Sequence, residues 1–262
     1  MTNPEEFRWD KDAEWIRLEE TVSTNTFLKT YKHEEGRLSY IVVTTQFQTA
    51  GRGQRGNSWE SEAGKNLLFS IAEEKVPVAP QDQFFISELI SCSIVSMLQE
   101  RFPAHKENFK IKWPNDIYWR DKKLAGILIE HELTDSHIAR TIIGVGLNVN
   151  QETFVSSAPN PVSLLQITGE ETSQPELLLH DLLTRYANVM LKYPEDSTYW
   201  QDHIRCQYHS MLYRKGILAR YQDTEGSFEA VLEEVEPNGM LCLRDCDSHI
   251  RRYAFKEVSY IL

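Results

Sequence analysis

A glycine-rich loop with two arginines follows a β-branched stretch that should be a buried strand. The loop reads Gln48-Thr49-Ala50-Gly51-Arg52-Gly53-Gln54-Arg55-Gly56-Asn57. Glycine lets backbone N–H groups approach an anion closely, and guanidinium groups bind carboxylate or phosphate with two hydrogen bonds. The loop therefore predicts a binding site for negative charge, with a solvated turn as the alternative. It has neither the Gly-Lys-Ser/Thr ending of a Walker loop nor the GxGxxG spacing of a dinucleotide fold.

A lysine stands directly before a predicted sharp turn in Lys112-Trp113-Pro114-Asn115-Asp116. Proline followed by Asn-Asp should end the strand and hold the ammonium group at the edge of a sheet. A cation fixed in this way can bring two anionic groups together. A solvated lysine before an ordinary turn is the alternative interpretation.

Three glycines interrupt two apolar segments that should be strands. Gly126 lies in the first segment, and Gly144 and Gly146 lie in the second. Glycine inside a strand often marks the close approach of a ligand or of another backbone, so the three together predict a flat binding floor. A β-bulge would explain any one of them equally well.

Hydrophobic periodicity predicts the elements that position these residues. Strands are expected at 15–20, 40–45, 66–72, 109–113, 123–133 and 138–149, and helices at 23–31, 84–102, 175–191 and 195–208. The intervals between the later strands are too short for crossover helices, which favours a mixed or antiparallel sheet with flanking helices. The fold class is therefore α+β.

The pattern changes from about Tyr213 onward. Short alternating runs at 216–221, 227–235, 240–244 and 250–255 are separated by Asp-Thr-Glu-Gly and Pro-Asn-Gly turns. This pattern is typical of a small β-barrel of roughly 50 residues. We therefore expect one domain over residues 1–212 and a second over residues 213–262.

Composition excludes several classes of protein. The net charge of -11 is opposite to what non-specific binding of nucleic acid requires. No apolar run approaches the length that spans a bilayer, and the polar, acidic start does not resemble a secretory signal. Four unevenly placed cysteines do not suggest a disulfide framework. We expect a cytoplasmic protein that binds neither DNA nor membranes.

Taken together, these segments resemble the biotin protein ligase family. The resemblance rests on five segments in the family's order: Ser23-Thr24-Asn25, Gly51-Arg52-Gly53 with the following Trp59, Lys112-Trp113-Pro114-Asn115-Asp116, Lys123-Leu124-Ala125-Gly126-Ile127-Leu128-Ile129-Glu130, and Gly144-Val145-Gly146-Leu147-Asn148. It covers about residues 20–150 and extends more weakly to the end of the chain. It implies a catalytic domain followed by an SH3-like barrel.

The resemblance also implies an activity, biotin–[biotin carboxyl carrier protein] ligase. Such an enzyme uses ATP and Mg²⁺ to form biotinyl-5'-adenylate, and then transfers biotin to one lysine of a carrier protein. The carrier belongs to acetyl-CoA carboxylase or a related carboxylase. A homodimer of the ligase is a further possible assembly.

Site residues are carried over by their place in the matching segments. Lys112 and Arg52 would be the catalytic cations. The implied biotin contacts are Ser23, Thr24, Asn25, Gln48, Gly51, Arg52, Gly53, Gln54, Lys112, Gly126, Gly144 and Gly146, and the implied nucleotide contacts are Arg55, Trp59, Asn115 and Asn148. No metal ligands are implied.

Two departures from the family pattern affect these expectations. Many relatives have a second arginine where this chain has Gln54, which keeps hydrogen-bonding capacity but lacks the charge. Arg55 could supply part of that charge. Some relatives carry an N-terminal winged-helix domain and repress transcription, but too few residues precede Trp15 to build one, so we expect a ligase without a DNA-binding domain.

Two alternatives come from other functional classes. A lipoate protein ligase would share the fold and the adenylation chemistry, but its arginine-rich Ser-Gly-Gly-Gly loop is not found here. A non-catalytic module would bind biotin without releasing pyrophosphate.

Overall fold

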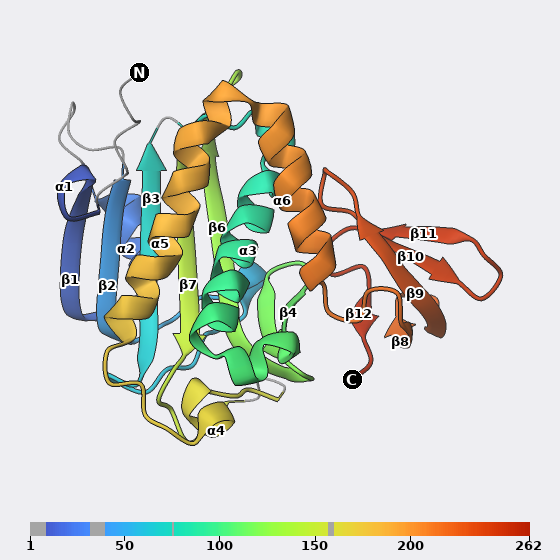
Figure 1. Cartoon of the computed structure of the whole chain (residues 1–262), viewed down its shortest axis with the longest axis horizontal. Helices are drawn as coiled ribbons and strands as arrows, with labels where there is room; N and C mark the ends of the chain where they lie inside the picture. The colour runs from blue at the N-terminus through green and yellow to red at the C-terminus, as the bar shows by residue number, and fades with distance from the viewer. Residues whose placement is uncertain (1–8, 32–39, 75, 157–159) are drawn as a thin grey trace. The chain divides into compact units, whose positions relative to one another are not determined.

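The computed structural model describes residues 9–31, 40–74, 76–156 and 160–262 (Figure 1). The chain forms two compact units, each assembled from separate stretches of sequence. The first comprises Met1–Pro80 and Lys122–Ser197, and the second comprises Gln81–Asp121 and Thr198–Leu262. The domain division between residues 212 and 213 stays a prediction. Among the described residues, no helix has the length and apolar character needed to cross a membrane.

Mixed pairing joins the strands of the first unit. In the order of pairing they are β1 (Ala13–Thr21), β2 (Tyr40–Gln48), β3 (Asn66–Glu74), β7 (Ile138–Asn148) and β6 (Lys122–Leu133). β1 runs parallel to β2, and the remaining pairs are antiparallel. The predicted mixed sheet is confirmed.

Helices cover both faces of this sheet (Figure 1). On one face, α2 (Thr24–Thr30) buries Leu28 against Ile41, Val43 and other apolar side chains of the strands. On the other face lies α5 (Pro175–Lys192), whose buried leucines recur at helical spacing. Burial of these apolar stripes stabilises the layers, because the hydrophobic effect scales with the apolar area removed from water.

A buried carboxyl group joins α5 to the sheet. Glu73 on β3 is 3% exposed and accepts hydrogen bonds from Tyr40 Oη at 2.9 Å and Tyr186 Oη at 2.7 Å. Burial raises the pKa of Glu73 from its ordinary value of 4.5 to about 7, although the two tyrosine hydroxyls act in the opposite direction. In the folded protein, Glu73 therefore holds its proton at a pH where the unfolded chain has lost it.

This proton makes the free energy of unfolding depend on pH. Between about pH 5 and pH 7 the folded state binds more protons than the unfolded state, so stability falls as pH rises, by roughly 3 kcal/mol for Glu73 alone. When the pH is raised from 5.5 to 8, the free energy of unfolding of Glu73→Gln should fall less than that of wild type, as measured by urea unfolding at each pH. The matched control is Glu74→Gln, because Glu74 pairs with Arg140 at 2.8 Å and is one-third exposed. An equal loss in Glu73→Gln and wild type would contradict this account.

The second unit contains two long elements and a hairpin. They are α3 (Phe84–Arg101), the hairpin of β4 (Phe109–Lys112) and β5 (Asp116–Trp119), and α6 (Ser197–Met211). α3 and α6 are joined through Glu88, whose carboxylate lies 3.5 Å from Arg205 Nε. Burial raises the pKa of Glu88 to about 7, against the effect of Arg205.

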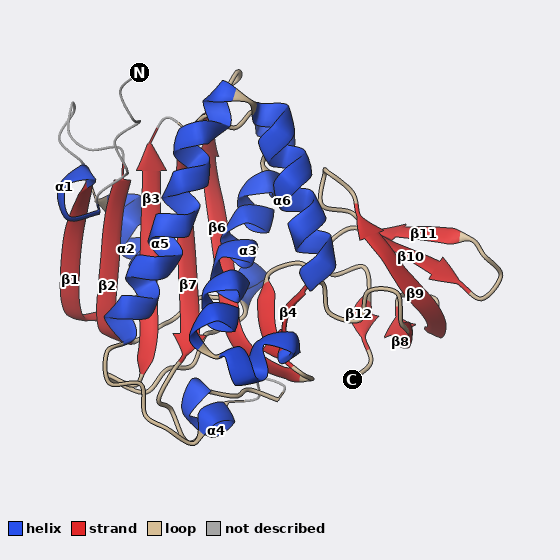
Figure 2. Cartoon of the chain, in the orientation of Figure 1, coloured by secondary structure: helices blue, strands red, loops and turns tan. Residues whose placement is uncertain are grey.

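A five-stranded antiparallel sheet completes the second unit (Figure 2). In pairing order its strands are β11 (Ile250–Tyr253), β10 (Leu241–Asp245), β9 (Ser227–Val235), β8 (Leu218–Gln222) and β12 (Ser259–Tyr260). All four pairings are antiparallel. This small all-β sheet is consistent with the predicted SH3-like barrel.

Several short elements were not predicted from the sequence. They are the strands β5 and β12, the helices α1 (Trp9–Asp12) and α4 (Leu164–Thr168), and the 3-10 helices Gln54–Gly56, Pro80–Asp82, Pro103–Asn108 and Tyr193–Glu195. The expected strands and helices are confirmed, with ends that differ by a few residues. Short elements give too few residues for a period to show.

Candidate ligand site

Polar side chains gather where α2 begins, against the sheet of the first unit. Gln48 Oε1 accepts a hydrogen bond from the Thr24 backbone N–H at 2.9 Å and lies 3.2 Å from Thr24 Oγ1. The Ser70 hydroxyl lies 2.7 Å from Thr24 Oγ1 and 2.6 Å from Asn25 Oδ1. Thr24, Asn25 and Ser70 are each buried. The cluster thus combines the hydrogen-bond donors and acceptors of uncharged side chains.

Ser23 stands at the N-cap position of α2, but its side chain does not cap the helix. Serine at an N-cap commonly accepts a hydrogen bond from an exposed backbone N–H group, but Ser23 makes no such bond here. Thr24 is the first helical residue, and its hydroxyl faces Gln48 instead. Ser23 is buried, and its carbonyl accepts from Phe27 N at 2.9 Å.

Gly144 permits the close approach of Asn25. A Cβ atom at position 144 would lie 2.0 Å from Asn25 Oδ1, well inside contact distance. Asn25 Nδ2 in turn donates to Leu128 O at 3.2 Å and to Glu130 Oε2 at 3.0 Å. The absence of a side chain at position 144 of β7 is therefore what allows the Asn25 amide to lie so close to the sheet.

Gly144→Ala should consequently destabilise the protein by about 1–3 kcal/mol, because the added methyl group displaces a fully hydrogen-bonded amide. The measurement is the urea midpoint at constant pH. Gly53→Ala is the matched control, since its added methyl group would meet nothing closer than 3.2 Å. If Gly144→Ala proved as stable as Gly53→Ala, the packing of Asn25 would not depend on this glycine.

The glycine-rich loop is closed on itself by backbone hydrogen bonds. Trp59 N donates to Gly51 O at 2.9 Å, and Gly53 N donates to Asn57 O at 2.7 Å. Arg52 and Ser58 form an isolated antiparallel bridge between these two bonds. A Cβ atom at Gly51 would lie 2.6 Å from Trp59 O, so the turn requires glycine there.

Trp59 lies against the glycines that were predicted to form a binding floor. Cβ atoms at Gly126 and Gly146 would lie 2.9 Å and 2.3 Å from the Trp59 indole. The ammonium group of Lys123 lies 5.7 Å from the centre of the Trp59 ring. The glycines therefore do permit close approach, and in this structure the approaching groups are Trp59 and Asn25.

Two buried polar atoms in this region have no hydrogen-bond partner among the described residues. They are Trp59 Nε1, a donor, and Asn148 Oδ1, an acceptor. Asn148 is 2% exposed, and its Nδ2 donates to Val162 O at 3.1 Å. Buried polar groups are rarely left unsatisfied in folded proteins, so these two atoms suggest a ligand or water that the protein groups complement.

Glu130 connects the polar cluster to the glycine-rich loop. Its carboxylate lies 3.1 Å from Arg52 Nη2, 2.7 Å from Lys29 Nζ and 3.0 Å from Asn25 Nδ2. Partial burial acts to raise the pKa of Glu130, but the contacts with Lys29, Asn25 and Arg52 outweigh it and hold the pKa below its ordinary range. An ionised Glu130 therefore anchors the guanidinium group of the loop.

Lys112 is the last residue of β4 in the second unit, as the predicted turn requires. Its ammonium group lies 4.8 Å from the ring centre of Tyr118 and 5.0 Å from that of Tyr260. The next residue, Trp113, is buried, and its Nε1 donates to Gly239 O at 2.9 Å. Lys112 is thus positioned by the end of a strand and by aromatic neighbours.

The structure describes the side chains of Gln54 and Asn115 but not that of Arg55. Gln54 begins a short 3-10 helix and is half-buried. The side chain of Arg55 lies outside the described part of the chain. Asn115 is half-buried in the turn between β4 and β5. The first unit therefore brings the predicted biotin residues of α2, the loop and the sheet together, whereas Lys112 and Asn115 belong to the second unit.

Sequence reasoning missed Ser70, Lys29 and the role of Glu130. Ser70 is a polar residue within an apolar strand, and Glu130 is an ionisable residue within β6. Such interruptions are a usable signal, because buried polar groups need partners. Lys29 is an ordinary lysine of a helix and carries no signal in the sequence.

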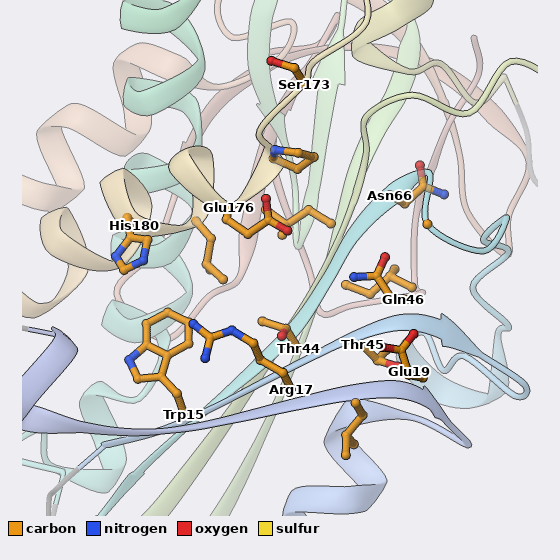
Figure 3. A pocket seen from close by; sticks show the side chains of 16 residues that line it. Trp15, Arg17, Glu19, Thr44, Thr45, Gln46, Asn66, Ser173, Glu176 and His180 are labelled. Atoms are coloured by element: carbon orange, nitrogen blue, oxygen red, sulfur yellow. The ribbon is translucent and has the colours of Figure 1, made fainter.

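A separate cavity of about 300 Å³ lies in the first unit, between the edge strands and the start of α5 (Figure 3). The stacked rings of Trp15 and His180 line one end, with Arg17 over Trp15. Glu19 and Glu176 bring negative charge to the same walls. None of the predicted site residues lines this cavity.

Comparison with known proteins gives a consistent family. Residues 18–148 match the Biotin/lipoate A/B protein ligase family. The bifunctional ligase/repressor BirA of Bacillus spizizenii is 29% identical over 209 residues, which cover 77% of this chain and 61% of that protein. The biotin–[acetyl-CoA-carboxylase] ligase of Mycobacterium tuberculosis is 30% identical over 142 residues, covering 52% and 51%. The chain thus spans about three-fifths of the length of the BirA protein it matches.

Solved structures of biotin protein ligases are also similar to this chain. The biotin protein ligase from Aquifex aeolicus in complex with biotin and ATP superposes with a TM-score of 0.72 and 25% identity, covering 94% of this chain and 97% of that one. The biotin protein ligase from Leishmania major with biotinyl-5-AMP gives a TM-score of 0.63 at 19% identity, covering 92% and 98%. The latter likeness shows the fold alone.

Proposed function

The chain belongs to the biotin/lipoate A/B protein ligase family, and we propose that it is an ATP-dependent biotin protein ligase. It forms biotinyl-5'-adenylate and transfers biotin to one lysine of a biotin carboxyl carrier protein. The observation that carries this proposal is the cluster of buried Thr24, Asn25 and Ser70 with half-buried Gln48, beside a loop whose arginine is anchored by Glu130. Uncharged polar side chains beside a loop that carries an arginine suit a ligand with a ureido head and a carboxylate tail.

Recognition of the ureido head requires both a donor and acceptors. Thr24, Asn25 and Gln48 offer hydroxyl and amide groups, and Ser23 is buried at the same helix start. The added-Cβ distances at Gly126, Gly144 and Gly146 show that only glycine lets another group approach these strands. We propose that biotin's ring and chain bind beside Trp59 and Asn25, which lie against these glycines, in contact with Gly51, Gly53 and Gln54 of the loop.

Activation joins two anions, so it needs positive charge. A carboxylate oxygen of biotin attacks the α-phosphorus of ATP, the bond to the β-phosphate oxygen breaks, and pyrophosphate leaves. Lys112 and Arg52 supply cations that offset the repulsion and stabilise the charge that develops on the phosphoryl oxygens. Mg²⁺ enters with ATP as part of the substrate.

The nucleotide is expected to contact residues near the loop and the end of β7. Trp59 Nε1 and Asn148 Oδ1 each lack a partner among the described residues, which supports a polar ligand beside them. Arg55 and Asn115 complete the proposed set.

Transfer needs no nucleophile from the enzyme. The mixed anhydride is already activated, so the ε-amine of the carrier lysine attacks the biotinyl carbonyl and AMP leaves. The enzyme's task is to keep water away until the carrier arrives. We place the reaction in the cytoplasm, with a carboxylase carrier as partner.

The test is incubation of the chain with ATP, biotin and an apo-carrier domain, followed by intact mass of the carrier. We expect addition of one biotinyl group, and no addition when lipoate replaces biotin. Lipoylation of a lipoyl carrier would favour the lipoate ligase alternative. Biotin binding without any pyrophosphate release would favour a non-catalytic binding module.

A further inference from the structure

Aromatic rings surround the proposed catalytic lysine within the second unit. The ammonium group of Lys112 lies 4.8 Å from the ring centre of Tyr118 and 5.0 Å from that of Tyr260. Tyr213 connects the two, with its ring 5.4 Å from Tyr118 and 6.0 Å from Tyr260. One of these rings comes from β5, beside Lys112 in the hairpin, and the other comes from the last strand of the chain.

Tyr260 is fixed by the backbone around it. It pairs with Tyr221 across β12 and β8, and their rings lie 5.2 Å apart. The following residue, Ile261, donates from its N–H to Arg220 O at 3.0 Å and accepts from Arg214 Nη1 at 2.9 Å. The ring of Tyr260 therefore has a defined place.

The hydroxyl group of Tyr260 does not explain its position. Tyr260 Oη is buried and has no hydrogen-bond partner among the described residues. A buried hydroxyl without a partner is a cost to folding, so the chain gains nothing from this oxygen in the structure. What Tyr260 offers to Lys112 is the face of its ring, whose negative electrostatic potential attracts a cation.

We propose that Tyr260 is a positioning residue for Lys112, holding the ammonium group through a cation–π contact so that the carboxyl-terminal strand takes part in activation. The proposal rests on the proposed function, in which Lys112 acts on the α-phosphate. Tyr118 supplies a second ring face from within the hairpin. The barrel sheet would then influence chemistry through one ring, without touching the reacting atoms.

The test separates the electrostatic effect of the ring from its volume. Tyr260→Phe keeps the ring face and should retain nearly wild-type pyrophosphate release. Replacing residue 260 by 4-fluoro-, 3,5-difluoro- and 3,4,5-trifluorophenylalanine withdraws electron density at nearly constant shape. We expect kcat for pyrophosphate release to fall stepwise along this series, by roughly three- to thirty-fold in total, with little change in KM for ATP.

Tyr260→Leu should lose at least as much activity as the trifluorinated variant. The control is Tyr253→Leu, because Tyr253 lies in the same sheet and its ring stacks on Phe228. Thermal unfolding of both leucine variants shows whether the sheet remains folded. A flat fluorine series would overturn the proposal and would leave Tyr260 a packing residue only.

Lys112→Ala, measured in parallel, distinguishes the proposed catalytic role of Lys112 from the proposed positioning role of Tyr260. If Lys112→Ala is inactive and the fluorine series is flat, the positioning role fails and the proposed function stands. If Lys112→Ala turns over normally, the proposed role of Lys112 fails, and the positioning role of Tyr260 fails with it.

Discussion

Lys112→Ala should release pyrophosphate at less than about one hundredth of the wild-type rate, because a positioned charge at a transition state contributes several kcal/mol. Lys112 ends β4 directly before the Trp113-Pro114 turn, and its ammonium group is held between two tyrosine rings. A residue fixed in this way does not need to reorganise when charge develops. The measurement is biotin-dependent pyrophosphate release at saturating ATP.

The control for this substitution is Lys110→Ala. Lys110 lies two residues earlier on the same strand and pairs with Tyr118 of β5. This substitution removes the same charge from the same hairpin and should leave turnover within about twofold of wild type, because Lys110 is not among the residues proposed to act on the substrates. Near-normal turnover in a folded Lys112→Ala protein would remove Lys112 from the mechanism.

Arg52→Gly should separate activation from containment. The guanidinium group of Arg52 is anchored to Glu130 at 3.1 Å, and the backbone of Arg52 bridges Ser58 across the closed loop. Activation depends more on Lys112 than on Arg52, so the variant should still make biotinyl-5'-adenylate, at a reduced rate. It should release the adenylate to solvent, because the loop no longer stays closed over it. Free adenylate acylates exposed lysines without selectivity, so bystander labelling should rise about tenfold or more per pyrophosphate released, given the several kcal/mol that ordered-loop contacts can contribute.

The readout is biotin incorporated into serum albumin at matched pyrophosphate output. Lys29→Ala is the control, because Lys29 contacts the same Glu130 oxygen at 2.7 Å but lies on α2, outside the loop. This variant should not raise bystander labelling. If Arg52→Gly labels albumin no more than wild type does, Arg52 acts in activation itself and not in containment.

Helices and strands whose hydrophobic periodicity extends over many residues could be located from the sequence alone. α3, α5, β6 and β7 lie close to where their apolar patterns predict them. β5 was missed because it begins at Asp116, directly after the turn of residues 113–115, and the proline and Asn-Asp there predict a loop. β12 has two residues, which is too short for alternation to be seen.

The three strand glycines show which property of the site could be predicted from the sequence. Gly126, Gly144 and Gly146 predicted close approach, and added Cβ atoms at these positions would indeed overlap other groups. The groups that approach, Trp59 and Asn25, come from segments 67 to 119 residues away from these glycines in the sequence, so only the folded structure identifies them. Local pattern predicts that space is needed and does not predict what fills it.

The Glu130 network was beyond sequence reasoning for a similar reason. Glu130 follows the apolar residues 124–129 in the sequence, and a charged residue in such a place usually faces solvent. Its partners Lys29, Asn25 and Arg52 come from α2 and the loop, each at least 78 residues away. The charge of Glu130 within an apolar strand signals a need for partners, but the identity of those partners is set by tertiary structure and has no local signature.

The most direct test of the central claim omits the carrier protein. The chain is incubated with biotin and ATP labelled at the α-phosphate, and the products are separated after acid quenching. Our account predicts labelled biotinyl-5'-adenylate together with pyrophosphate, dependent on biotin and lost in Lys112→Ala. Formation of ADP and phosphate, or no labelled adenylate from a folded chain that binds both substrates, would contradict it.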